Sequence, residues 1–167
     1  RGQVQTAFRI LVSTNPEKLT ADAGDLWDSG KVQSNATSQI VYNGRSLTSR
    51  DRVYWKVRAW DASDRPSDWS EAATWSMGLL DQMDWHALWI GYNTDELIED
   101  PDLHIPPAPY LRKTFTLKKP IREAVVYATA LGLYELSLNG QTVSEDLFAQ
   151  GWSDYRTRVY YSTYDVT

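Results

Sequence analysis

The chain has 167 residues, a formal net charge of −5 and no cysteine, which excludes disulfides, thiolate metal sites and cysteine nucleophiles. Its basic residues are scattered and form no stripe that could follow a phosphate backbone, so we expect no nucleic-acid partner. No apolar run approaches the roughly 20 residues of a membrane span. The 8 tryptophans and 10 tyrosines, against 3 phenylalanines, are typical of β-sandwich cores and of carbohydrate contacts alike.

Short segments rich in β-branched and aromatic residues, separated by turn residues, predict an all-β fold. In the first half the predicted strands cover residues 7–13, 26–32, 39–42, 53–60 and 69–77. Residues 16–24 are predicted to be a loop with at most one helical turn. Asp28-Ser29-Gly30 indicates a turn or bulge, and Asn43-Gly44 closes the third strand.

The strand predicted at 53–60 has the clearest alternation. Val53, Trp55, Val57 and Ala59 should face the core, and the intervening Tyr54, Lys56, Arg58 and Trp60 should face outward. Trp60 is the exception on this polar face. It either covers the sheet edge or contacts the next domain.

Gly78 to Asp84 is the predicted domain junction, after which Trp85, Trp89 and Ile90 should be buried as the opening strand of a second unit. The acidic, proline-rich segment 94–109 is predicted to be an irregular loop. Further strands are predicted at 111–117, 124–130, 133–138 and 158–164. Asn139-Gly140 favours a tight hairpin turn after the alternating residues that precede it.

None of the 22 acidic residues lies in a pattern that identifies a catalytic pair, so no catalytic residue is assigned. The acidic residues of the loop could ligate calcium, but they lack the ligand spacing and the glycine of an EF-hand, so a solvated loop is the better interpretation. They are Asp95, Glu96, Glu99, Asp100 and Asp102. His86 and His104 are too far apart for a zinc site, and no metal ligand is assigned.

Aromatic and charged residues interleave near the end of the chain. A sugar offers apolar C–H faces for stacking and hydroxyl groups that need hydrogen-bond partners. We therefore predict a sugar-binding surface formed by Asn139, Trp152, Asp154, Tyr155 and Arg158. The alternative is structural: the aromatics belong to a core or sheet edge, Asn139 is only a turn residue, and Asp154 and Arg158 form a local pair.

Several motifs occur in a characteristic order: QTAFRILVST (5–14), LWDSGKV (26–32), VYWKVRAWD (53–61), SDWSE (67–71), MGLL (77–80), PAPYLRKTF (107–115), LGLYELSLNG (131–140) and GWSDYRTRVYYSTYDVT (151–167). In this order they resemble the N-terminal non-catalytic region of bacterial α-L-rhamnosidases. The resemblance implies two β-sandwich units. Residues 1–79 would be a fibronectin III- or immunoglobulin-like sandwich without its opening strands. Residues 80–167 would be the first part of a jelly-roll-like, galactose-binding-like sandwich.

The resemblance further implies that the chain is a piece of a longer glycosidase whose catalytic carboxylates lie in a helical barrel downstream. The partners would be that barrel and a rhamnose-containing glycan. No cofactor is required, although some relatives bind rhamnose with calcium in the second unit. A secreted or periplasmic location is favoured over the cytoplasm. Two alternatives stay open: a free-standing carbohydrate-binding module, and a ligand-free structural or adhesion spacer.

Overall fold

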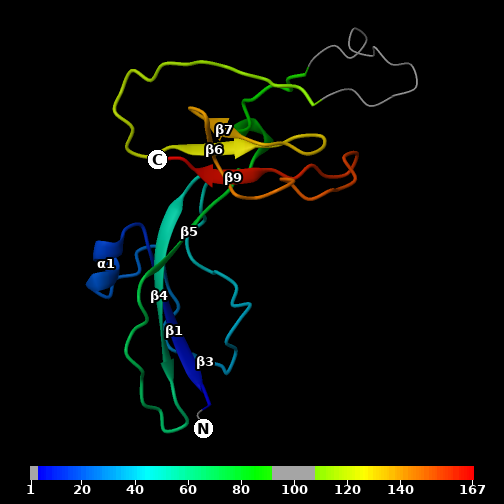
Figure 1. Ribbon diagram of the computed structural model, residues 1–167. Coiled ribbons are helices and arrows are strands. Elements are labelled where there is room, and N and C mark those ends of the chain that lie inside the picture. Colours follow the sequence, from blue (N-terminus) through cyan, green and yellow to red (C-terminus); the bar gives the residue numbers. More distant parts are fainter. Residues whose placement is uncertain (1–3, 92–107) are drawn as a thin grey trace, which may run out of the picture. The chain divides into compact units, whose positions relative to one another are not determined.

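The computed structural model describes residues 4–91 and 108–167. The chain divides into two compact units, Arg1–Leu88 and Trp89–Thr167 (Figure 1). Within the described residues, regular structure is almost entirely β, which confirms the predicted fold class. The exceptions are helix α1, Pro16–Thr20, and one turn of 3-10 helix, η1, Gln82–Asp84. No helix of the described part is long and apolar enough to cross a membrane.

The first unit is built on one antiparallel sheet. Its strands are β1 (Ala7–Ser13), β2 (Trp27–Asp28), β3 (Val32–Gln33), β4 (Arg52–Trp60) and β5 (Ala73–Ser76). Strand β1 pairs with β4 along its whole length, from Ala7 opposite Trp60 to Ser13 opposite Tyr54. The other edge of β1 pairs with both β2 and β3, and β5 pairs with β4. The predicted turn separates β2 from β3, where Gly30 has a φ of +61°.

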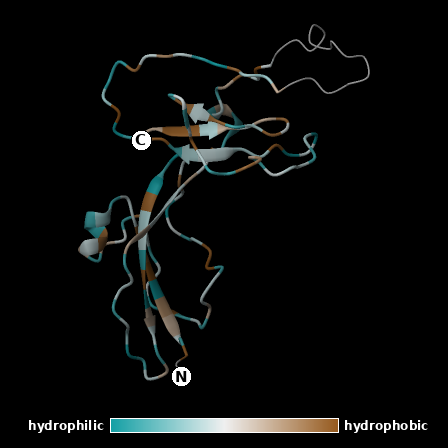
Figure 2. Ribbon diagram, viewed as in Figure 1, coloured by the Kyte–Doolittle hydropathy of each residue, from teal (hydrophilic) through white to brown (hydrophobic). Residues whose placement is uncertain are grey.

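One face of this sheet carries the core. Phe8, Ile10 and Val12 of β1 pack with Val53 of β4 and with Leu26. Ile40, Tyr42 and Leu47 lie partly buried against this cluster. The segment that carries them, residues 34–50, therefore covers the core face. Hydrophobic and hydrophilic residues both occur along β1 and β4 (Figure 2). The second face of β1 is buried as well, because Ala7, Leu11 and Ser13 are 0% exposed.

Two strand predictions for this unit were wrong in extent. Residues 39–42 alternate as a strand would, with Val41 exposed between the half-buried Ile40 and Tyr42, but they pair with no neighbouring strand in the described structure. The last strand begins at Ala73 rather than at Trp69. Before it, the hydroxyl oxygens of Ser67 and Ser70 accept the amide hydrogens of Ala59 and Val57, at 3.2 and 3.1 Å, in place of backbone carbonyls.

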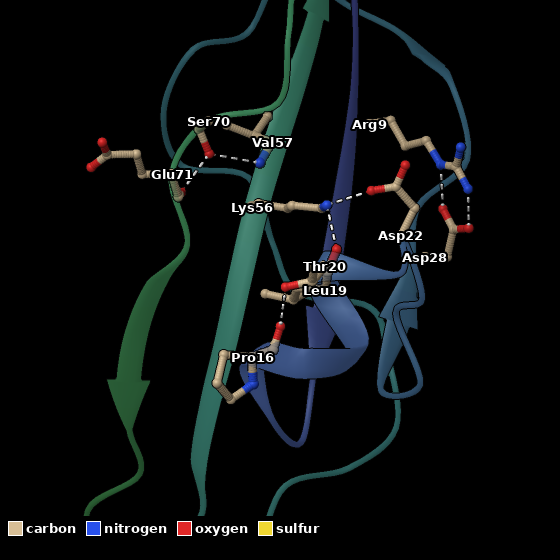
Figure 3. Close-up of polar contacts among 10 residues, drawn as sticks. All are labelled: Arg9, Pro16, Leu19, Thr20, Asp22, Asp28, Lys56, Val57, Ser70 and Glu71. Carbon is tan, nitrogen blue, oxygen red and sulfur yellow. Dashed lines mark hydrogen bonds and ion pairs between the residues drawn. The ribbon is translucent and has the colours of Figure 1, made fainter.

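The opposite face of the sheet is not simply solvated, because α1 lies against it. Lys56 is only 7% exposed, although the alternation placed it outward. Its ammonium donates hydrogen bonds to the Leu19 carbonyl and to the Asp22 carboxylate (Figure 3). The same ammonium lies 4.7 Å from the centroid of the Trp69 ring, and the Arg58 guanidinium lies 4.5 Å from it. A buried charge is tolerated here because it has both a partner and an aromatic face.

Helix α1 is attached to β1 at its start. Asn15 caps the helix by accepting the Lys18 amide hydrogen at 2.9 Å, and Pro16 occupies the first turn, where its missing N–H costs nothing. The Asp25 carboxylate then joins helix and strand by accepting hydrogen bonds from Ser13, Thr14 and Lys18. Leu19 is thereby held in the interior at 1% exposure.

The predicted junction is fastened to the first unit. Asp81 and Asp84 form a capping box around η1. The hydroxyl oxygen of Ser49 accepts the Leu80 amide hydrogen at 2.7 Å, and the Arg50 guanidinium donates to the Asp84 carbonyl at 2.8 Å. Residues up to Asp84 therefore continue the first unit.

In the second unit β6 (Val125–Ala128) pairs with β9 (Ser162–Asp165), and β7 (Ser137–Leu138) pairs with β8 (Gln141–Thr142). Asn139 and Gly140, with φ of +53° and +82°, form the two-residue turn between β7 and β8, which confirms the predicted hairpin. The other strands are shorter than predicted, and residues 111–117 form none.

No residue of 108–167 is fully buried. The prediction that Trp89 and Ile90 are buried in an opening strand was also wrong, because they are 64% and 75% exposed, and residues 85–90 form no strand. The physical reason is that paired ribbons of two strands have too little surface to enclose an interior. Other exposed apolar side chains of this unit include Leu111, Phe115, Leu117, Ile121, Leu131, Leu133, Leu147 and Phe148.

Candidate functional site

A hollow of about 280 Å³ lies in the second unit between the β7–β8 hairpin, the following loop and β9. Its lining combines three kinds of group: carboxylates, hydroxyl groups and apolar side chains. The lining residues are Glu135, Glu145 and Asp146; Tyr134, Thr142, Ser144 and Tyr164; and Leu136, Leu147 and Ala149. Acceptors, donors and apolar surface in one concavity are what a small polar ligand with an apolar side requires.

Backbone contacts hold the walls of the hollow. The Tyr134 amide donates to the Ala149 carbonyl at 3.0 Å, which joins the segment before β7 to the loop after β8. The Val143 amide donates to the Leu136 carbonyl at 2.9 Å and extends the hairpin. The loop turns at Ser144, whose hydroxyl oxygen accepts the Asp146 amide hydrogen at 3.0 Å.

Two phenols meet at the hollow. The hydroxyl oxygens of Tyr134 and Tyr164 are 2.9 Å apart and share one hydrogen bond. Partial burial, together with Tyr164 and the negative charge of Asp146, raises the pKa of Tyr134 to about 12. The phenol is therefore protonated at neutral pH, and its hydroxyl group has two neighbouring partners, the Tyr164 hydroxyl and the Ala128 carbonyl at 3.5 Å. The three carboxylates are acceptors only, so the hollow favours a ligand with several hydroxyl donors.

The structure separates the five residues predicted to bind sugar. Trp152, Asp154, Tyr155 and Arg158 share one loop, whereas Asn139 is the left-handed residue of the hairpin turn. None of the five lines the hollow. Whether they contact sugar stays a prediction.

Part of the structural alternative for these residues is wrong. Trp152 is 88% exposed, so it is not a core aromatic, whereas a place at a sheet edge stays open for it and for Tyr155. Asp154 pairs with Arg156, through Nε at 3.2 Å, rather than with Arg158. Arg158 instead places its guanidinium 5.8 Å from the Tyr160 ring centroid. The closer partner is available because Arg156 lies two residues away in the same tight turn, where its amide also donates to Asp154.

Sequence reasoning did not identify the residues that line the hollow. The signal it could have used is the Ser144-Glu145-Asp146 run, which lies shortly after the β7–β8 hairpin and lines the hollow together with Tyr134 and Leu136. Polar residues that follow a hairpin at the end of an apolar ribbon are well placed to rim a cavity.

The described residues show no set of ligands for the metal ion considered from the sequence. The residues described, 4–91 and 108–167, contain no group of three or more His, Asp or Glu side chains that could hold a metal ion. The acidic segment Asp95 to Asp102 and His104 lie outside the described residues. Calcium binding in this unit therefore stays an expectation.

Comparison with known proteins covers both units. Residues 1–81 match the family described as "Rha78A-like, N-terminal immunoglobulin domain", and residues 119–167 match "Alpha-L-rhamnosidase N-terminal domain". An α-L-rhamnosidase of Alteromonas sp. (strain LOR) is 41% identical over 165 residues, and one of Formosa agariphila is 39% identical. Each comparison covers 98% of this chain and 18% of the relative.

A solved structure agrees with this relationship. The α-L-rhamnosidase from Dictyoglumus thermophilum superposes with a TM-score of 0.83 and 35% identity, over 98% of this chain and 19% of that one. The first unit is thus an immunoglobulin-like β-domain, and a second β unit follows it in the chain. The chain belongs to the N-terminal region of the α-L-rhamnosidase family. It spans about a fifth of the length of the relatives that it matches.

Proposed function

We propose that this chain is the non-catalytic N-terminal region of a longer α-L-rhamnosidase, where it supports the catalytic region and binds a rhamnose-containing glycan. One observation carries the proposal. The chain aligns over 98% of its length with two α-L-rhamnosidases, and the alignment covers only 18% of the length of each. The parent reaction would be hydrolysis of terminal α-L-rhamnosides, and its reacting groups would lie in the remaining part of the protein.

The supporting role is argued from the exposed apolar surface of the second unit. Leu111, Phe115 and Leu117 are exposed in a segment without a strand partner. Apolar surface of this kind is stabilised when it is covered, and each fully covered side chain contributes about 1.5–3 kcal/mol. The catalytic region of the same polypeptide is the partner that the family relationship implies.

The catalytic part of the proposal is tested by comparing the 167-residue chain with the longer protein. The assay measures release of 4-nitrophenol from 4-nitrophenyl α-L-rhamnopyranoside. We expect turnover by the longer protein and none by the 167-residue chain. Turnover by the short chain would refute the non-catalytic role. Hydrogen exchange of residues 111–117 should slow in the longer protein if that segment becomes covered.

The lining of the hollow supports the proposal that the second unit binds sugar. A deoxy sugar offers an apolar methyl group and several hydroxyl donors, which match the Leu136 and Leu147 side chains and the carboxylates of the lining. The test is calorimetric titration with L-rhamnose, in calcium and in EDTA. We expect saturable binding that weakens at least tenfold in Asp146→Asn, while Asp68→Asn in the first unit, outside the hollow, binds normally.

The hollow also supports a second candidate, a free-standing carbohydrate-binding module. That function requires saturable binding of L-rhamnose by the 167 residues alone and no rhamnosidase activity in the protein as it occurs in the cell. A ligand-free spacer requires that no heat of binding is seen at millimolar sugar in either form. The two assays together therefore distinguish all three functions.

A further inference from the structure

Trp152 is an exposed aromatic on a firmly held loop. Its side chain is 88% exposed, although tryptophan is usually among the more buried residues. Just before it, the Gln150 side-chain amide donates to Thr129 Oγ1 at 2.9 Å and to the Ala130 carbonyl at 3.0 Å. Just after it, the Ser153 hydroxyl donates to the Arg158 carbonyl at 2.6 Å. Trp152 therefore lies between two residues, Gln150 and Ser153, whose side chains are hydrogen-bonded to other residues of the unit.

The turn that follows is closed by its own backbone. The amides of Thr157 and Arg158 both donate to the Asp154 carbonyl at 2.8 Å, and the Asp154 carboxylate accepts from Arg156. A side chain presented from such a turn loses little further backbone freedom when it binds a ligand, and less lost freedom means tighter binding.

Trp152 is also close to the hollow along the chain. Ala149 lines the hollow, and its carbonyl is fixed by the Tyr134 amide at 3.0 Å. Only Gln150 and Gly151 lie between Ala149 and Trp152, so the Cα atoms of Ala149 and Trp152 are at most about 11 Å apart. A saccharide of two or three units that occupies the hollow could therefore extend to the indole ring.

We propose that the sugar site has two parts: the hollow takes one sugar unit, and Trp152 stacks on the next unit of an oligosaccharide. The ligand class is accordingly a glycan chain rather than a single sugar. This inference rests on the proposed sugar binding of the second unit. A large flat aromatic ring matches the apolar C–H face of a pyranose, and the neighbouring Asp154 and Arg156 supply an acceptor and a donor for its hydroxyl groups.

The experiment compares affinities for L-rhamnose and for thio-linked rhamno-oligosaccharides of two and three units, which glycosidases do not cleave. Calorimetry is run on the 167-residue chain and on the longer protein. We expect the oligosaccharides to bind about three- to tenfold more tightly than L-rhamnose, as one added stacking contact implies. Trp152→Ala should remove this gain, and Trp152→Phe should keep most of it.

Tyr110→Ala is the matched control, because it also removes a fully exposed aromatic of the second unit, far from the hollow in sequence. It should leave the gain intact. Equal affinity for one and three units, or a gain that survives in Trp152→Ala, would overturn the inference while leaving the hollow as a site for one sugar. Loss of the gain only in the longer protein would show that Trp152 is covered there by polypeptide, which also overturns it. If no sugar binds in any form, the sugar-binding proposal itself fails.

Discussion

The Asp25 carboxylate offers the sharpest test of how the first unit is held together. It accepts hydrogen bonds from the Ser13 hydroxyl at 2.7 Å, the Thr14 amide at 2.9 Å and the Lys18 ammonium at 2.6 Å. Ser13 is fully buried, so its hydroxyl has no access to water as an alternative partner. In Asp25→Ala this buried donor loses its acceptor, which costs about 1–3 kcal/mol. The partly exposed Lys18 pair adds at most about 1 kcal/mol.

Urea unfolding followed by tryptophan fluorescence measures the effect. We expect the free energy of unfolding of the first unit to fall by about 2–3 kcal/mol in Asp25→Ala. Asp25→Asn keeps an oxygen acceptor of nearly the same shape and should lose only about 1 kcal/mol. A loss below about 0.5 kcal/mol in Asp25→Ala would contradict the view that this carboxylate joins α1 to β1.

The pH dependence of the same carboxylate has a definite sign. Partial burial alone would raise the pKa of Asp25, but the hydrogen bonds from Lys18, Thr14 and Ser13 outweigh it and hold that pKa well below its usual range. A lowered pKa in the folded state contributes stability that is present above the unfolded pKa of about 3.9 and is lost as the pH falls below it. The difference in unfolding free energy between the wild type and Asp25→Asn should therefore be constant near neutrality and shrink below about pH 4. A difference that grows on acidification would refute the assignment.

Three further predictions follow from other contacts. Lys56→Ala removes the hydrogen bonds that a nearly buried ammonium donates to the Leu19 carbonyl and the Asp22 carboxylate, and should destabilise the first unit by about 2 kcal/mol in urea unfolding, whereas Lys31→Ala, which removes a more exposed pair, should cost at most about 1 kcal/mol. Gly140→Val places a β-branched residue at a φ of +82°, so the hairpin should lose about 1–2 kcal/mol, seen as faster hydrogen exchange of the Val143 amide. Because the pKa of Tyr134 is raised to about 12, ultraviolet titration should show one phenol that ionises late, and its contribution to stability should be present below about pH 10 and fall as the pH rises towards 12.

Local signals in the sequence located several elements correctly. The apolar, β-branched run of residues 7–13 is β1 at the predicted bounds, and Asn139-Gly140 forms the predicted turn. These features depend on side-chain alternation and on the φ angles that Asn and Gly tolerate, which are properties of a few adjacent residues. The motif order along the chain likewise sufficed to indicate the family.

Other features depended on residues distant in sequence. Residues 39–42 have the alternation of a strand, but a strand also needs a hydrogen-bonded neighbour, and none is present in the described structure. Lys56 was expected to face solvent and is instead covered by α1, where Leu19 and Asp22, more than thirty residues away, receive its hydrogen bonds. The pairing of Asp154 with Arg156 rather than Arg158 was decided by the shape of one turn.

The candidate site shows the same division. Sequence alone pointed to the aromatic and charged loop from Trp152 to Arg158, because composition and interleaving are visible without a fold. The hollow could not be read in this way, since Tyr134, Asp146 and Tyr164 come together only when the hairpin, its following loop and β9 are placed side by side. By itself, then, the sequence determined the β class, the turns and the family relationship, all of which depend on local pattern. Tertiary structure decided which polar groups are buried, paired or gathered around a cavity, because these depend on the neighbours that folding brings into contact.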